Sequence, residues 1–230
     1  MIDKNRHTAL LVNILKDIYS EPKLRTKLGF KGGTAVYLFY DLPRMSVDLD
    51  FDLLTSGDDK IIFQTINKIL SNYGKIKDTR EKRFTIFFLL SYEVAHLNIK
   101  VEISKRQSVN QYEKKSYLGV SVLVATKETL VSSKLAAFLS RKRLASRDVY
   151  DLWYMLKLGW DLDEDIVNHY LQLNLEQAIQ KAITKIDSIK QSQLLQGVGE
   201  LLDSSNKNWV RGKLKEELLF QLKLRQKILK

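Results

Sequence analysis

The segment Lys31–Asp52, KGGTAVYLFYDLPRMSVDLDFD, contains two features that together predict the fold. Its paired glycines, Gly32 and Gly33, predict a turn that leads into one or two turns of helix at 35–40. Its last residues, DLDFD, alternate acidic and apolar side chains from Asp48 onward. Alternation with a period of two indicates a β-strand, with apolar side chains on the core face and carboxylates on the other. We therefore expect a turn, a short helix and an acidic strand in close succession.

The acidic strand predicts a metal site. Asp48 and Asp50 are two residues apart, which places their side chains roughly 6.5–7 Å apart on one face of the strand. Neighbouring carboxylates repel each other, and a shared cation offsets this repulsion. Hard oxygen ligands suit Mg²⁺ or Mn²⁺, and Mg²⁺ often binds one or two carboxylates together with substrate phosphates. We expect such an ion at Asp48 and Asp50.

The turn before the helix predicts a phosphate site. Glycine leaves backbone N–H groups uncovered, and successive N–H groups at a helix N-terminus bind anions. We expect Gly32, Gly33 and Thr34 to bind nucleotide phosphates, while Lys31 either faces those phosphates or lies at a solvated strand edge. A phosphate-binding turn about a dozen residues before two strand carboxylates indicates metal-dependent phosphoryl or nucleotidyl transfer.

The spacing of these residues also resembles a known motif. GGT at 32–34 followed by S-x-D-x-D at 46–50 resembles the motif of the nucleotidyltransferase superfamily. With Lys31 and Arg44 included, the segment is similar to the AbiEii/AbiGii toxins of abortive infection and type IV toxin–antitoxin systems. The resemblance implies an α/β (α+β) fold, in which a small mixed β-sheet with flanking helices precedes an all-helical C-terminal half. It also implies a nucleoside triphosphate (NTP) as substrate.

A second stretch carries the same resemblance. The strings KLAAFLSR at 134–141 and RDVYDL at 147–152 are similar to another signature of the AbiEii-type toxins. The resemblance implies that Lys134 and Asp148 are catalytic or nucleotide-binding, with Asp151 as a further candidate. Lys134 can neutralise a triphosphate as a point charge, and Asp148 can hold Lys134 or accept a hydrogen bond from ribose. The alternative for both is a salt bridge between helices.

Glu102 is the candidate for a third carboxylate. The segment Leu97–Ser104 alternates apolar and polar residues, so it predicts a strand with Glu102 on its polar face. The resemblance implies that a carboxylate here, next to the Asp48–Asp52 strand, is a metal ligand and deprotonates the attacking hydroxyl. The alternatives are a surface acid beside Lys100, or Asp148 as the base.

Periodicity predicts the remaining elements and a soft domain boundary after residue 125. We expect a sheet domain at 1–125 and a helical domain at 126–230. The expected elements are helices at 7–19, 58–73 and 127–143, strands at 28–31, 83–92 (buried on both faces) and 119–125, a loop at 105–117, two or three helices within 163–202, and a basic amphipathic helix at 206–230.

Composition limits the compartment and the partners. The 230 residues include no cysteine, which excludes disulfides and zinc–thiolate sites and suits a reducing cytoplasm. No apolar stretch approaches the roughly 20 residues of a membrane span, and the first residues do not resemble a signal peptide. The net charge of +11 favours a polyanionic partner, nucleic acid first.

These observations support a specific expectation. The chain transfers a nucleoside monophosphate to a hydroxyl, and the acceptor is RNA, such as the 3′ end of tRNA. The resemblance implies a toxin with a cognate antitoxin protein and no membrane partner. Two alternatives remain: a transferase that modifies a protein or a small molecule, and a catalytically silent nucleotide-binding module.

Overall fold

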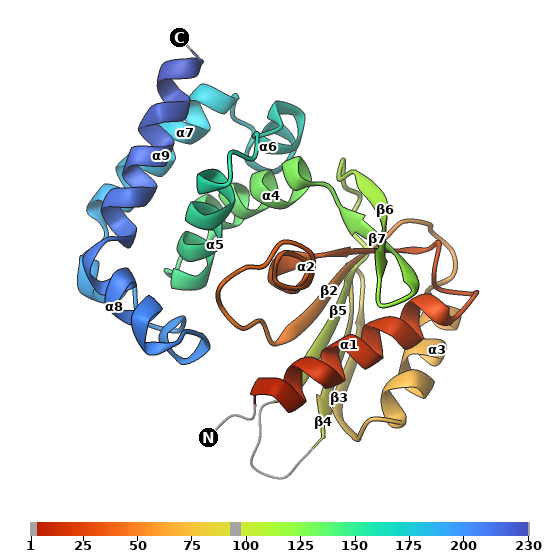
Figure 1. The fold of residues 1–230 in the computed structure, drawn as a ribbon. Helices are drawn as coiled ribbons and strands as arrows, with labels where there is room; N and C mark the ends of the chain where they lie inside the picture. Colours follow the sequence, from red (N-terminus) through yellow and green to blue (C-terminus); the bar gives the residue numbers. More distant parts are fainter. Residues whose placement is uncertain (1–3, 93–97, 230) are drawn as a thin grey trace. The chain divides into compact units, whose positions relative to one another are not determined.

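The computed structural model describes residues 4–92 and 98–229 (Figure 1). The chain divides into two compact units. The first unit contains the residues up to Ala125 except for two short segments, 42–44 and 108–111. Those two segments belong to the second unit, together with the residues from Thr126 onward. Each unit is therefore built from more than one stretch of chain.

The first unit is built on a mixed sheet, as the sequence predicts. Within the described residues its strands follow the order β3-β4-β5-β2-β1-β7-β6 (Figure 1). The pairs β2–β5 and β1–β7 are parallel, and the other neighbours are antiparallel. The strands are β1 (Leu28–Lys31), β2 (Asp48–Leu53), β3 (Lys75–Lys82), β4 (Thr85–Ser91), β5 (Ile99–Ser104), β6 (Tyr112–Tyr117) and β7 (Val120–Ala125).

Two helices cover one face of this sheet. The ring of Tyr19 in α1 (Lys4–Ser20) packs against Phe51 of β2, and Phe63 of α3 (Asp59–Ser71) packs against Phe88 of β4. Phe51 and Phe88 are fully buried beneath these helices. The apolar residues of β2 therefore face the core, as their alternation predicts, and the aspartates point to the other face.

The strand predicted at 83–92 is β4, but it is not buried on both faces. Ile86, Phe88 and Leu90 are fully buried, whereas Phe87 and Leu89 are half-buried. The apolar run looks continuous in the sequence because the second face also carries large apolar side chains. Since α1 and α3 cover only the first face, Phe87 keeps contact with solvent on the second.

Two edge strands do not follow the sequence predictions. The predicted loop at 105–117 is wrong at its end, because 112–117 forms β6, and β3 was not expected at all. Their sequences, YEKKSY and KIKDTREK, lack an alternating apolar pattern. Both strands lie at the edges of the sheet, where charged residues, lysine above all, discourage pairing with another chain. The start of the predicted strand at Leu97 lies outside the described residues.

The second unit is helical. Thr126 caps its first helix by accepting a hydrogen bond from the backbone N–H of Thr129. The predicted helix at 206–230 is instead two helices, interrupted around Lys213. None of the helices within 4–92 and 98–229 is long and apolar enough to cross a membrane. The helices are α4 (Lys127–Ser140), α5 (Ser146–Lys157), α6 (Glu164–Leu171), α7 (Leu175–Ser188), α8 (Ser204–Gly212) and α9 (Leu214–Ile228).

Candidate active site

A short helix, α2 (Gly32–Phe39), begins directly after β1. The helix therefore starts at Gly32, three residues earlier than predicted. Lys31 occupies the N-cap position and makes no side-chain capping hydrogen bond. The first N–H groups of a helix have no partner within it, and the helix dipole favours anions there. The start of α2 is thus suited to bind phosphate, as the glycines predict.

Gly32 brings the start of α2 against the acidic strand. Its φ of +81° lies in the left-handed region, where a side chain is strained. A Cβ at this position would lie 2.6 Å from Oδ2 of Asp50, which is closer than a normal contact. Glycine is therefore required twice, by the backbone conformation and by the neighbouring carboxylate. This close approach places a phosphate-binding helix terminus next to a candidate metal ligand.

Thr34 fixes the first turn of α2 to the strand. Its buried hydroxyl forms hydrogen bonds with the hydroxyl of Ser46, at 2.8 Å, and with the backbone carbonyl oxygen of Asp48. The side chains of Thr34 and Ser46 therefore stabilise the entrance to β2. Only the backbone N–H of Thr34 is left for a phosphate.

Glu102 lies beside the aspartates, as predicted. In the parallel pair β2–β5, Asp50 is opposite Glu102 and Asp48 is opposite Lys100. Partners in neighbouring strands point to the same face and are separated by about 4.8 Å. Lys100 also forms an ion pair with Asp48, with 3.3 Å between Nζ and Oδ2. One face of the sheet thus carries Asp48, Asp50 and Glu102 in adjacent positions.

The electrostatics of Asp50 favour a bound cation. Burial raises the pKa of the Asp50 carboxyl, and the neighbouring carboxylates of Asp48 and Glu102 raise it further, while Lys100 opposes them. A divalent cation would remove this repulsion, and two aspartates completed by substrate phosphates are a normal set of ligands for Mg²⁺ or Mn²⁺. The donors present therefore fit the predicted metal. Among residues 4–92 and 98–229, no three His, Cys, Asp or Glu side chains are grouped as a metal site.

Asp52, the third acid of β2, has a different environment. It is buried and forms an ion pair with Lys31, with 2.5 Å between Nζ and Oδ1. The hydroxyl of Tyr112 donates a hydrogen bond to its other oxygen. Lys31 is therefore neither simply solvated nor unpaired, and its predicted contact with phosphate stays a prediction.

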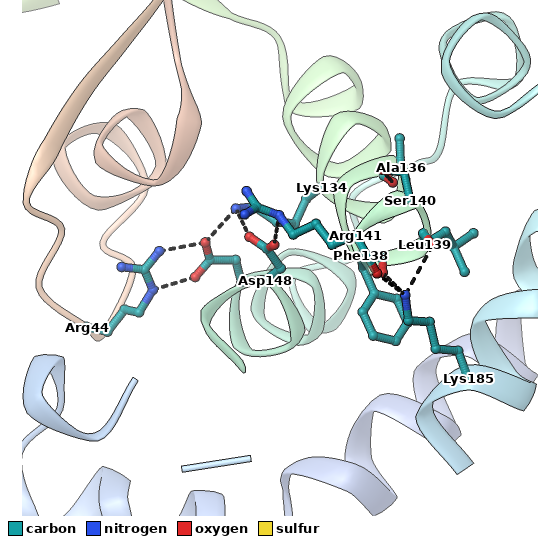
Figure 2. Close-up of polar contacts among 10 residues, drawn as sticks. Arg44, Lys134, Ala136, Phe138, Leu139, Ser140, Arg141, Asp148 and Lys185 are labelled. Carbon is teal, nitrogen blue, oxygen red and sulfur yellow. Dashed lines mark hydrogen bonds and ion pairs between the residues drawn. The ribbon is translucent and has the colours of Figure 1, made fainter. Parts of the chain in front are cut away.

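The second unit contains a separate group of buried charges (Figure 2). The guanidinium of Arg44 donates two hydrogen bonds to Asp151, at 2.5 Å from Nε and 2.6 Å from the terminal nitrogen. Lys134 lies 3.0 Å from oxygens of both Asp148 and Asp151, and Nε of Arg141 lies 2.8 Å from Asp148. The salt bridge between helices that was the alternative for Lys134 is thus present.

These pairs keep the group ionised. Burial disfavours the charged ammonium of Lys134, but Asp151 and Asp148 outweigh this effect and raise its pKa. Burial also disfavours the carboxylate of Asp151, but Arg44 and Lys134 outweigh it and lower its pKa. Three cations thus surround two carboxylates, and one positive charge remains without an opposite charge inside the group.

Comparison with known proteins identifies the family. A sequence profile described as "Nucleotidyl transferase AbiEii toxin, Type IV TA system" matches residues 13–209. The chain belongs to this family. The chain is therefore a nucleotidyltransferase, and membership implies a nucleotide substrate and an antitoxin partner.

Solved structures of similar fold agree with the family. One is a protein from H. pylori assigned as a nucleotidyltransferase, with a TM-score of 0.64, 20% identity and coverage of 98% of this chain and 96% of that one. Another is JHP933 from Helicobacter pylori, with a TM-score of 0.58, 19% identity and the same coverage. At this identity the likeness shows the fold alone. No curated protein matches the chain at a significant level.

The structure brings together two sets of predicted residues and adds partners that the sequence did not reveal. Asp48, Asp50 and Glu102 lie on one sheet face beside the start of α2, and Lys134 and Asp148 lie together in the second unit. Tyr112 lies in the predicted loop at 105–117, but its ring lies over the backbone of Gly29, where a Cβ would lie 2.2 Å from it. A lone glycine inside a strand was the one available signal for such a close approach.

Replacing Gly32 tests the approach of Asp50. We expect Gly32→Ala to reduce stability by more than the roughly 1–2 kcal/mol of a left-handed alanine, and to abolish nucleotide binding, because the new methyl displaces Asp50. Gly57→Ala is the matched control, since Gly57 also has positive φ but has open space around it. Urea unfolding and equilibrium dialysis with labelled NTP measure both effects. Equal losses of stability and of NTP binding in the two variants would contradict the close approach of Asp50 to Gly32.

Replacing Asp50 tests the electrostatic repulsion between its carboxylate and those of Asp48 and Glu102. Because its pKa is raised in the folded state, the ionised carboxylate lowers stability as pH rises through that pKa. We expect Asp50→Asn to increase the melting temperature at pH 7 without Mg²⁺, and to give less gain near pH 4. Asp52→Asn should instead lower the melting temperature, since it removes the partner of Lys31. Thermal unfolding at both pH values distinguishes these outcomes.

Replacing Arg44 tests the buried charges of the second unit. Arg44→Ala leaves Asp151 with one cation fewer in a buried position, so we expect a loss of about 3–5 kcal/mol in the free energy of unfolding. Arg141→Ala is the control, because this side chain is 49% exposed, and should cost less than about 1 kcal/mol. Denaturant titration compares the two. Similar losses would show that the Arg44 pair is not the dominant contact.

Proposed function

We propose that this protein transfers a nucleoside monophosphate from an NTP to a hydroxyl of RNA, with Mg²⁺ or Mn²⁺ as cofactor, as the toxin of a toxin–antitoxin pair. The observation that carries the proposal is the contact between Asp50 and Gly32. It joins a phosphate-binding helix terminus to a carboxylate whose raised pKa favours a cation. Phosphate and metal sites in contact are what nucleotidyl transfer requires.

Each part of the site has a separate task in the proposed reaction. The N–H groups at the start of α2 bind the phosphates of the NTP, and Asp48 and Asp50 hold the metal. The metal neutralises charge on the phosphates when bound. Glu102 lies next to Asp50 and takes the proton from the attacking hydroxyl. The hydroxyl oxygen forms a bond to the α-phosphorus, the bond from that phosphorus to the bridging oxygen breaks, and pyrophosphate leaves.

The proposal also includes Lys134 as a nucleotide-binding residue, in keeping with the family resemblance. Its raised pKa supports this assignment, because the ammonium stays charged at neutral pH. Asp148 then keeps Lys134 in position. Asp148 and Asp151 are both held by cations, so Glu102 is the better candidate for the base.

RNA is the proposed acceptor because the chain has a net charge of +11. Neutralising phosphates is the main source of affinity in nucleic-acid binding. The 3′ end of tRNA supplies a free hydroxyl, and the cognate antitoxin would restrain this reaction in the cytoplasm.

Labelling tests the proposed function. Purified protein is incubated with Mg²⁺, total RNA and each α-³²P-labelled nucleotide in turn. We expect label on a tRNA-sized band with the wild type and at least a hundredfold less with Asp48→Ala, because the metal site is lost. Asp187→Ala is the control, since this acid is largely exposed on α7, and should label normally.

The other outcomes have defined meanings. Mg²⁺-dependent nucleotide binding without RNA labelling would move the acceptor to a protein or a small molecule. Absence of any nucleotide binding would contradict the enzymatic proposal.

A further inference from the structure

The face of the sheet that carries the aspartates continues beyond Glu102. In the antiparallel pair β4–β5, Phe87 is opposite Glu102, and in the pair β3–β4, Arg80 is opposite Phe87. Since Glu102 is itself opposite Asp50, four side chains form one row across four neighbouring strands. Partners in a row point to the same face. The row therefore connects the proposed reaction centre to an aromatic residue and an arginine.

Phe87 is a large apolar residue that is only half-buried. Its chain neighbours Ile86 and Phe88 are fully buried under the helices, whereas Phe87 lies on the opposite face and is half-buried. The guanidinium of Arg80 lies 5.8 Å from the centre of its ring, within cation–π distance. Arg80 is also paired with Asp78 at 2.7 Å, and its side chain remains 58% exposed. An aromatic ring with an arginine beside it is a surface on which nucleic-acid bases stack.

The position of this pair relative to the phosphate site defines which substrate it can bind. The start of α2 follows β1, which lies on one side of β2, whereas β5, β4 and β3 lie on the other (Figure 1). In phosphoryl transfer the attacking and leaving oxygens are roughly in line. Because the leaving pyrophosphate lies on the side of β1 and α2, the attacking hydroxyl comes from the side of β5. Phe87 and Arg80 lie further along that same side.

The spacing suits one nucleoside. Neighbouring strands are about 4.8 Å apart, so Phe87 lies one such step from Glu102 and roughly 10 Å from Asp50. A nucleoside whose base stacks on Phe87 therefore has its ribose over Glu102, on the side of Asp50. Lys82, at the end of β3, is exposed and can meet the phosphates that precede this nucleoside.

We propose that Phe87 and Arg80 form the binding site for the terminal nucleoside of the RNA acceptor, whose base stacks on Phe87 while its hydroxyl lies at Glu102. This inference deepens the proposed function and rests on it. It assigns the pair to the acceptor strand and not to the base of the NTP.

Binding measurements without catalysis test the site. A short fluorescent RNA that ends in CCA-3′ is titrated with the full chain in the absence of NTP. We expect Phe87→Ala to weaken RNA binding about tenfold or more, and Arg80→Ala to weaken it by several-fold. Phe87→Tyr should bind the RNA as the wild type does, because base stacking needs an aromatic ring. NTP binding, measured by equilibrium dialysis, should be unchanged in all three variants.

Two control variants separate stacking from general effects. Phe84→Ala removes a more exposed phenylalanine that also has an arginine over its ring, Arg83 at 4.9 Å, but lies in the β3–β4 turn outside the row. Lys60→Ala removes one exposed positive charge from α3 on the opposite face of the sheet. We expect both controls to bind the RNA within about twofold of the wild type.

A crosslink locates the terminal nucleoside directly. The same RNA with a 3′-terminal 4-thiouridine should crosslink to the segment 80–87, and Phe87→Ala should lose this product. Equal weakening by Phe87→Ala and Phe84→Ala, a crosslink elsewhere, or weaker NTP binding with unchanged RNA binding would each overturn the inference.

The inference and the proposed function fail in different measurements. If the wild type binds the RNA and crosslinks through 80–87 but never labels any RNA, the proposed reaction is contradicted and the nucleoside site stands. If the wild type labels RNA while Phe87→Ala leaves the KM for RNA unchanged, the reaction stands and the nucleoside site is contradicted.

Discussion

The close approach of Asp50 to Gly32 is the constraint on which the rest of the first unit depends. It requires a residue without a side chain at the start of α2, and it requires β1 and β2 to be neighbours in the sheet. Thr34 and Ser46 then fix the helix to the strand through their hydroxyls. The apolar half of β2 packs beneath α1, so that the carboxylates are carried by a rigid element. A rigid strand keeps these like charges close together, although Lys100 pairs with Asp48.

The aspartates Asp50, Asp52 and Asp151 fall into two electrostatic classes. Asp52 and Asp151 are buried and each has cations in contact, so they hold the structure together. Burial raises the pKa of Asp50, and its neighbours Asp48 and Glu102 raise it further against Lys100 and Lys31, which makes the folded protein less stable. A position that costs stability in the absence of ligand is a position where a ligand gains affinity. The difference in electrostatic environment between Asp50 and the chemically identical Asp52 and Asp151 is therefore the clearest physical sign of the site.

Much of the fold and of the candidate site was predictable from the sequence, and the reasons differ between elements. The glycines at 32–33 and the alternation in β2 are local signals, and the local structure follows them. The strand order is not local, so neither the edge position of β6 nor the contact of Tyr112 with Asp52 could be inferred. For the same reason the row from Asp50 to Arg80 could not be inferred from the sequence, because it exists only through the register of four strands.

The division of the chain into units has a consequence for engineering. The helical unit includes 42–44, a segment that lies between α2 and β2 in the sequence, and Arg44 in it pairs with Asp151 of α5. No single cut in the polypeptide separates the units, and a fragment that ends at residue 125 would carry an arginine whose carboxylate has been removed. A chimera that exchanges helical units between relatives must therefore transplant 42–44 and 108–111 together with the helices.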